Sequence, residues 1–168
     1  MFGKLFGAML MVACGVITCT AQLDGINVST NWGESACGGV QLSIGLSTNI
    51  LIAGSKMTLT ARIKNSPSNF IYVVLLNPHT DFAVCLTNDS GKAYKLTPGQ
   101  DPNIWRRFVH KLDAGEVYEC SVPVTVGENI ERGDYVLKVT RKVLIPDSTG
   151  GNNKDCELVS NLLKVQVK

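Results

Sequence analysis

The sequence has few charged residues, and their charges nearly cancel. Of 168 residues, 18% are Asp, Glu, Lys or Arg, and the formal net charge is +2. Proteins that bind nucleic acid or acidic membranes generally depend on a strong excess of basic residues. The charge balance therefore gives no electrostatic reason to expect either partner.

The motifs of common catalytic and cofactor sites are also missing. The chain has no Gly-rich phosphate loop, no His-Glu-x-x-His and no Gly-x-Ser-x-Gly. Only His79 and His110 could act as bases near neutral pH. His79 would need an aligned nucleophile, and His110 alternates with Phe108 and Leu112 as a half-buried strand residue does. The sequence predicts no enzymatic activity, no cofactor and no metal.

No stretch has the apolar spacing of a helix. In the segment 131–143, Tyr135, Leu137 and Val139 fall at every second position, which is typical of a strand with one face on a core. Eight further stretches of similar length, separated by turns, are strand-like: 40–46, 57–64, 70–76, 82–86, 92–96, 106–112, 118–126 and 163–167. This pattern predicts an all-β domain of eight or nine strands, in two packed sheets or one closed sheet. The apolar run 70–76 predicts a central strand with both faces covered.

The N-terminus has the layout of a secretory signal peptide. Lys4 gives a positive start, residues 5–17 are uncharged and apolar, and Ala21 ends the segment with a small side chain. The apolar run is shorter than the roughly 20 residues that span a bilayer as a helix. We expect cleavage after Ala21, an exported protein that is secreted or periplasmic, and no transmembrane span after cleavage.

Two alternatives for the N-terminus stay open: a short membrane anchor, or a lipid attached at Cys14 or Cys19. After the predicted signal peptide at 1–21, residues 22–39 are rich in Ser, Thr, Asn and Gly and predict an irregular segment. No internal repeat or long linker divides the remainder, so residues 40–168 are expected to form one domain.

Cysteine usage is consistent with export. Two of the six cysteines lie in the predicted signal peptide, and four remain: Cys37, Cys85, Cys120 and Cys156. An even number in an oxidising compartment favours two disulfides, with three possible pairings. Zinc sites usually take cysteines in close pairs, and these four are far apart in the sequence.

The start of the segment 131–143 resembles the turn into strand F of immunoglobulin-like domains. Glu131 is followed by Gly133 and then Tyr135. In those domains the tyrosine hydroxyl bonds back to the backbone at a corner between sheets. Antibody domains have a cysteine two residues after that tyrosine. This chain has Leu137 there, so the usual inter-sheet disulfide is absent.

Further turn motifs resemble bacterial exported immunoglobulin-like domains. Residues 112–116 (Leu-Asp-Ala-Gly-Glu) precede a strand and then the Gly133-Asp134-Tyr135 turn. Residues 81–84 (Asp-Phe-Ala-Val) and 88–92 (Asn-Asp-Ser-Gly-Lys) are similar to the bacterial intracellular proteinase inhibitor domain. The resemblance implies an immunoglobulin-like antiparallel β-sandwich over residues 40–168, with proteinase inhibition as one activity. No reactive-site residue of that family can be matched to this chain, and the signal peptide departs from an intracellular inhibitor.

The resemblance also implies a disulfide pairing. In immunoglobulin-like sandwiches the first and last strands can run parallel and adjacent. Cys37 precedes the first predicted strand and Cys156 precedes the last. The resemblance therefore implies a Cys37–Cys156 bond, which leaves Cys85 to pair with Cys120.

One candidate binding surface combines two loops. Trp105, Arg106 and Arg107 follow the longest Pro-containing loop, and an aromatic beside two guanidiniums can stack on a sugar or hold a carboxylate. The loop around His79 would join them if it lies at the same end of the domain. The sequence predicts a non-enzymatic exported binding or accessory module for an unknown protein or saccharide ligand. Alternatives are a proteinase-inhibitor-like domain and a carbohydrate-binding module that uses Trp32 or Trp105.

Overall fold

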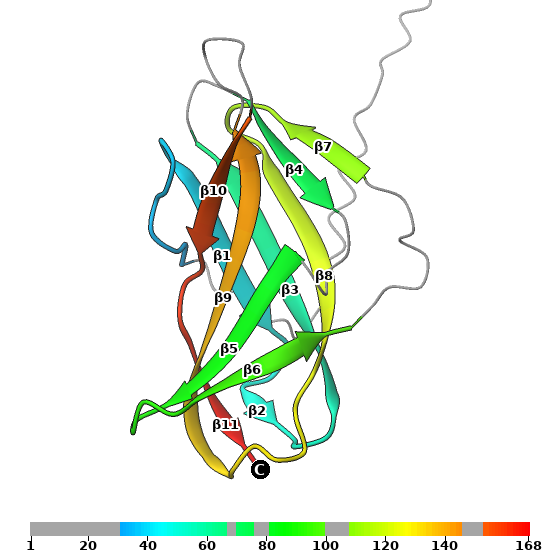
Figure 1. Ribbon diagram of the computed structural model, residues 1–168, viewed down its shortest axis with the longest axis vertical. Helices are drawn as coiled ribbons and strands as arrows, with labels where there is room; N and C mark the ends of the chain where they lie inside the picture. Colours follow the sequence, from blue (N-terminus) through cyan, green and yellow to red (C-terminus); the bar gives the residue numbers. More distant parts are fainter. Residues whose placement is uncertain (1–30, 67–69, 76–80, 100–107, 146–152) are drawn as a thin grey trace, which may run out of the picture.

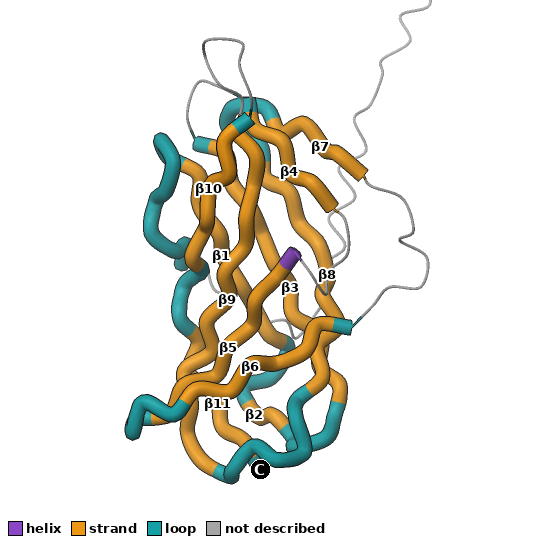
Figure 2. Tube along the Cα trace, viewed as in Figure 1, coloured by secondary structure: helices purple, strands orange, loops and turns teal. Residues whose placement is uncertain are grey.

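The computed structural model describes residues 31–66, 70–75, 81–99, 108–145 and 153–168. All of its named elements are strands, as Figure 1 shows. Figure 2 colours the described chain as strand and loop, apart from one short helical piece just before β5. The prediction of an all-β protein is therefore confirmed. Over these residues no helix is long and apolar enough to cross a membrane. The eleven strands are β1 (Val40–Leu46), β2 (Ile50–Leu51), β3 (Lys56–Asn65), β4 (Ile71–Leu75), β5 (Phe82–Asn88), β6 (Ala93–Pro98), β7 (Phe108–Leu112), β8 (Val117–Thr125), β9 (Gly133–Ile145), β10 (Lys154–Val159) and β11 (Leu163–Val167).

Two strands were not predicted from the sequence. β2 has two residues, which is too short to show alternation, and β10 has only Cys156 and Leu158 as buried positions. Both form by pairing with longer neighbours, β2 with β11 and β10 with β9. Before β1, residues 31–39 form no strand beyond a single bridge at Ala36, as the irregular composition predicts.

The strands form one curled, hydrogen-bonded sheet. Its main path runs in the order β1-β3-β8-β6-β5-β9-β11-β2. β6 connects the two halves, because its first residues pair with β5 and its last two pair with β8. At the other side, Leu42 on β1 forms a bridge with Ser160, which follows β10. The curl brings β1, β3 and β8 to face β5, β9 and β10 across the core (Figure 1).

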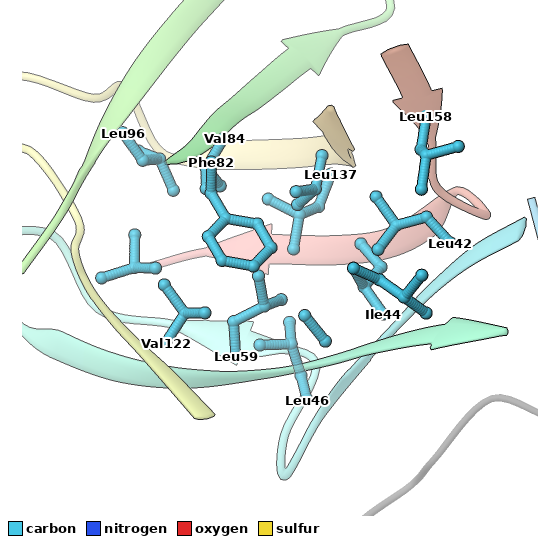
Figure 3. Packing of buried hydrophobic residues seen from close by; sticks show 14 of the residues in the cluster. Leu42, Ile44, Leu46, Leu59, Phe82, Val84, Leu96, Val122, Leu137 and Leu158 are labelled. Atoms are coloured by element: carbon cyan, nitrogen blue, oxygen red, sulfur yellow. The ribbon is translucent and has the colours of Figure 1, made fainter. Parts of the chain in front are cut away.

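The core fills the space between these two halves. Side chains from β1, β3 and β8 meet side chains from β5, β6, β9 and β10 in Figure 3. Full burial of each such aliphatic or aromatic side chain contributes about 1.5–3 kcal/mol, so this cluster is the main source of stability. The labelled members are Leu42, Ile44, Leu46, Leu59, Val122, Phe82, Val84, Leu96, Leu137 and Leu158.

The tyrosine corner predicted from the sequence is present. The Tyr135 hydroxyl donates a hydrogen bond of 2.7 Å to the backbone oxygen of Glu131. Tyr135, Leu137 and Val139 are all buried, as the alternation predicts. The bond satisfies the one polar atom of a mostly buried ring, and it fixes the turn that leads into β9.

The prediction for the apolar run 70–76 was wrong. Ile71 and Val73 are buried, but Tyr72 is half-buried and Phe70 is 37% exposed. β4 lies near the edge of the sheet, because it pairs with β9 only through Tyr72 and otherwise with β7. The face of Ile71 and Val73 is covered, whereas the opposite face is only partly covered at Tyr72.

The Cys37–Cys156 disulfide is present, with its two Cα atoms 6.2 Å apart. The second pairing was wrong, because Cys85 and Cys120 are free thiols. On β5, Cys85 alternates with the buried Val84 and so faces away from the core. On β8, Cys120 shares the inward face of Val122. The two thiols lie on opposite sides of the sheet, so they cannot bond.

Gly33 lies where the segment before β1 passes between the two halves of the sheet. Its backbone nitrogen donates a 2.8 Å hydrogen bond to the Leu42 oxygen. A Cβ atom at this position would clash with the Val159 carbonyl oxygen and would lie 2.9 Å from the Leu42 oxygen. Both obstacles are backbone atoms, which cannot rotate away.

Replacing Gly33 with Ala should therefore destabilise the protein by at least about 2 kcal/mol, because the added methyl group forces the two strands apart. Urea unfolding followed by tryptophan fluorescence measures this loss. Gly127→Ala is the matched control, because its Cβ would meet only the Ile130 side chain at an ordinary 3.5 Å. Equal stability of the Gly33 variant and the wild type would contradict the close approach.

Candidate functional site

The four residues of the predicted binding surface, His79, Trp105, Arg106 and Arg107, lie outside the described residues. Trp32 is half-buried, and its ring faces cations on β3: Arg62 is 5.4 Å and Lys64 5.8 Å from the ring centroid. This ring face therefore packs against the protein's own side chains and is not an open platform for a sugar.

His110 is half-buried, as predicted, and its ring lies against Tyr118 at 5.4 Å. The same inward face of β8 carries Cys120, which accepts a long hydrogen bond of 4.0 Å from the Arg141 guanidinium. Arg141 is only 1% exposed and also stacks over Phe82, with 4.3 Å between the guanidinium carbon and the ring centroid. Side chains alternate between the two sides of β9, so Arg141 points to the same inward side of the strand as Tyr135.

Partial burial makes the thiol of this cluster a weak nucleophile. Burial raises the pKa of the Cys120 thiol, although the Arg141 charge opposes the shift. Burial also raises the pKa of Tyr118 to about 12. Because the thiolate is the reactive form of cysteine, a thiol that stays protonated at neutral pH is a poor nucleophile. We therefore assign Arg141 and Cys120 to the interior of the fold.

A polar hollow on the outer side of the sheet is a better candidate for a binding site. We call it the β9–β11 groove, and its volume is about 490 Å³. It is lined by Asn49, Ile50, Asp89, Asp134, Tyr135, Val136, Lys164, Val165 and Gln166. The size lies within the range of small-ligand sites. The lining comes from four segments: the approach to β2, the β5–β6 turn, β9 and β11.

Strand pairing and side-chain bonds hold the groove. Gln166 is opposite Asp134 in the β9–β11 register, and its amide donates a 3.2 Å hydrogen bond to the Asp134 carboxylate. The backbone of Gln166 also donates to the Asn49 oxygen at 2.8 Å. These bonds fix the relative positions of three lining residues before any ligand arrives.

The β5–β6 turn, which carries Asp89, is held in a similar way. The Asn88 side-chain oxygen accepts hydrogen bonds from Ser90 and from the Lys92 backbone. Lys92 then forms a 2.6 Å salt bridge with Glu131 beside the tyrosine corner. That bond lowers the pKa of the Glu131 carboxyl and raises the pKa of Lys92. The groove therefore has a preformed wall next to the tyrosine corner.

Chemically, the groove offers carboxylates, amides and one ammonium group. Such groups accept and donate hydrogen bonds to a ligand rich in hydroxyl groups. Within the described ranges, no three His, Cys, Asp or Glu side chains lie close enough together to hold a metal ion. The arrangement supports binding. Sequence reasoning missed the groove because its lining residues become neighbours only through the strand register.

No family model matches the chain, and no curated protein matches it. Among solved structures it is similar to a β-glucosidase from Listeria innocua, at 16% identity and a TM-score of 0.41, covering 76% of this chain and 16% of that chain. It is also similar to an alkylpurine DNA glycosylase from Pseudomonas fluorescens, at 15% identity and a TM-score of 0.40, covering 76% of this chain and 30% of that chain.

A third similar structure is a PapD-like domain of human CEP192, at 10% identity and a TM-score of 0.28, covering 75% of this chain and 81% of that chain. The chain spans less than a third of the glucosidase and of the glycosylase. At these identities and scores, none of the three carries an argument about function.

The two free thiols should differ in reactivity. Cys85 faces outward, whereas burial raises the pKa of Cys120, so alkylation at pH 7 should modify Cys85 first. Modification of Cys120 should accelerate only when the pH rises above the ordinary range of a thiol. Iodoacetamide labelling followed by peptide mass spectrometry measures both rates, with Cys120→Ser as the control for assignment. Faster labelling of Cys120 than of Cys85 at pH 7 would show that the inward placement is wrong.

Proposed function

We propose that this protein is a non-enzymatic, exported binding module of the immunoglobulin-like β-sandwich type, and that the β9–β11 groove is its ligand site. The sandwich assignment is supported by the tyrosine corner and by the two facing halves of the curled sheet. The chain then acts as a rigid frame that presents a recognition surface on its outer side.

Export is supported by the disulfide and by the predicted signal peptide at 1–21. A disulfide between Cys37 and Cys156 persists in oxidising compartments and is rare in the cytosol. The mature protein is then secreted or periplasmic, with lipid attachment as the alternative.

The groove is the observation that carries the binding role. It is preformed, polar and held by hydrogen bonds between strands. Two described side chains that could serve in catalysis, by contrast, are used in packing: His110 lies against Tyr118, and Cys120 faces the interior. This contrast favours binding over catalysis.

A saccharide is the ligand class that the groove favours. Amide and carboxylate groups such as those of Asn49, Gln166 and Asp134 pair well with sugar hydroxyls. A protein ligand, including a proteinase, would be expected to insert apolar or aromatic anchors into its binding site. The groove has one exposed apolar residue of this size, Ile50, at 40% exposure.

Binding of soluble polysaccharides to the mature chain tests this proposal. Affinity electrophoresis against a panel of neutral and acidic polysaccharides should give retardation by at least one of them. The double variant Asp134→Ala with Gln166→Ala should weaken it about tenfold, because two groove hydrogen-bonding groups are lost. Glu157→Ala, an exposed position on β10, is the control and should bind normally.

Two results would contradict the proposal. One is the absence of retardation by the whole panel, and the other is retardation that the groove variant leaves unchanged. A proteinase titration is run in parallel. Loss of proteinase activity at micromolar protein would favour the inhibitor-like alternative.

A further inference from the structure

Three lysines lie on the same outer side of the sheet as the groove. Along β6, β9 and β11, Lys95, Lys138 and Lys164 alternate with buried residues, so all three face away from the core. The register places Cys85 of β5 directly between Lys95 and Lys138. Lys164 is opposite Val136, two residues before Lys138 on β9. We call this surface the lysine face, and the strands that carry it adjoin one another in Figure 1.

Lys95, Lys138 and Lys164 take part in no salt bridge within the described ranges, although Lys164 shares the groove lining with Asp89 and Asp134. The salt bridges within the described ranges use other cations, namely Arg62, Lys92, Lys111 and Lys142. Between the lysines the surface consists of short uncharged side chains, Ala83, Cys85 and Thr87 on β5. No acidic side chain stands opposite Lys95, Lys138 or Lys164 in the strand register. A locally positive surface results on a chain whose net charge is nearly zero.

The spacing of the lysines points to an extended ligand. Neighbouring strands are about 4.8 Å apart, so the backbones at Lys95 and Lys138, two strands apart, are separated by roughly 10 Å. A single small anion needs donors that converge on one point. Ammonium groups spread across three strands instead match a polymer that carries repeated negative charges.

The lysine face is continuous with the β9–β11 groove, because Lys164 and Val136 belong to both. We propose that the two surfaces together bind an acidic polysaccharide, whose carboxylate or sulfate groups lie over the lysines while its hydroxyl groups occupy the groove. This inference rests on the proposed function and specifies its ligand. The carboxylates of Asp89 and Asp134 favour hydroxyl groups in the groove and repel anionic ones, which orients the chain of sugars.

An acidic peptide fits this surface less well. Protein interfaces concentrate aromatic and large apolar side chains at their centre. The centre of the lysine face has Cys85, Ala83 and Thr87 in those positions. The short side chains leave room for sugar rings to lie flat against the sheet.

The test uses the mature chain and three probes: polygalacturonate for carboxylate groups, heparin for sulfate groups, and neutral dextran. We expect binding to polygalacturonate or heparin, and the tighter of the two identifies the anionic group. The double variant Lys95→Gln with Lys138→Gln should weaken this binding about tenfold, and 0.5 M salt should weaken it similarly. Lys56→Gln with Lys154→Gln removes the same charge elsewhere and should bind like the wild type.

Cys85 provides an independent readout of position. Saturating polygalacturonate or heparin should slow the alkylation of Cys85 at least threefold, because the bound chain covers it, and should leave Cys120 unaffected. Dextran at the same concentration should give no protection. This measurement locates the ligand even where the lysine variants change affinity only slightly.

Several outcomes overturn the inference. They are equal binding of the two double variants, unprotected Cys85, or binding of poly-glutamate or duplex DNA as tight as that of the polysaccharides. Binding of dextran alone, sensitive to the groove variant, would overturn the acidic ligand and leave the proposed binding function standing. Absence of binding to all the probes and to the wider panel would overturn both.

Discussion

The alternation of side chains along β9 is the constraint on which the rest of the structure depends. This strand pairs with β4, β5, β10 and β11, more neighbours than any other. Its inward row fills the core, and its outward row includes Val136 and Lys138. A shift of the register by one residue would exchange the two rows and would remove both the core and the candidate binding surface. The fold and the candidate binding surface therefore depend on the same stretch of sequence.

The two halves of the curled sheet are joined at both sides by different means. At one side β6 passes from one half to the other, with hydrogen bonds to β5 and then to β8. At the other side the contact is tighter and depends on Gly33, the Leu42 bridge and the Cys37–Cys156 disulfide. A conformational change that opens the halves would have to break one of these joints. The groove and the part of the lysine face on β5, β9 and β11 lie on one half, and Lys95 lies where the joining strand β6 pairs with β5.

Much of the fold could be predicted from single residues and their spacing. The inward positions of Tyr135, Leu137 and Val139 and the hydroxyl bond of Tyr135 followed from the sequence. β2 and β10 could not be predicted, because strands with so few apolar positions form only when longer partners are in place. The sequence already contained evidence against the predicted Cys85–Cys120 pairing. Cys85 comes directly after the inward-facing Val84, so it points outward. Cys120 lies two positions before the inward-facing Val122, so it points inward, and the two thiols are on different sides of the sheet.

The candidate site was harder to predict than the core. The groove joins Asn49, Asp89, Asp134 and Gln166, which are distant in sequence and carry no shared motif. Only the pairing of β9 with β5 and β11, and of β11 with β2, brings them together, and strand pairing is not readable from composition. The long reach of the disulfide has a separate consequence. Its two cysteines are separated by 119 positions, so a proteolytic cut anywhere between them leaves both fragments covalently attached. In the presence of proteases, such a nicked molecule remains a single unit.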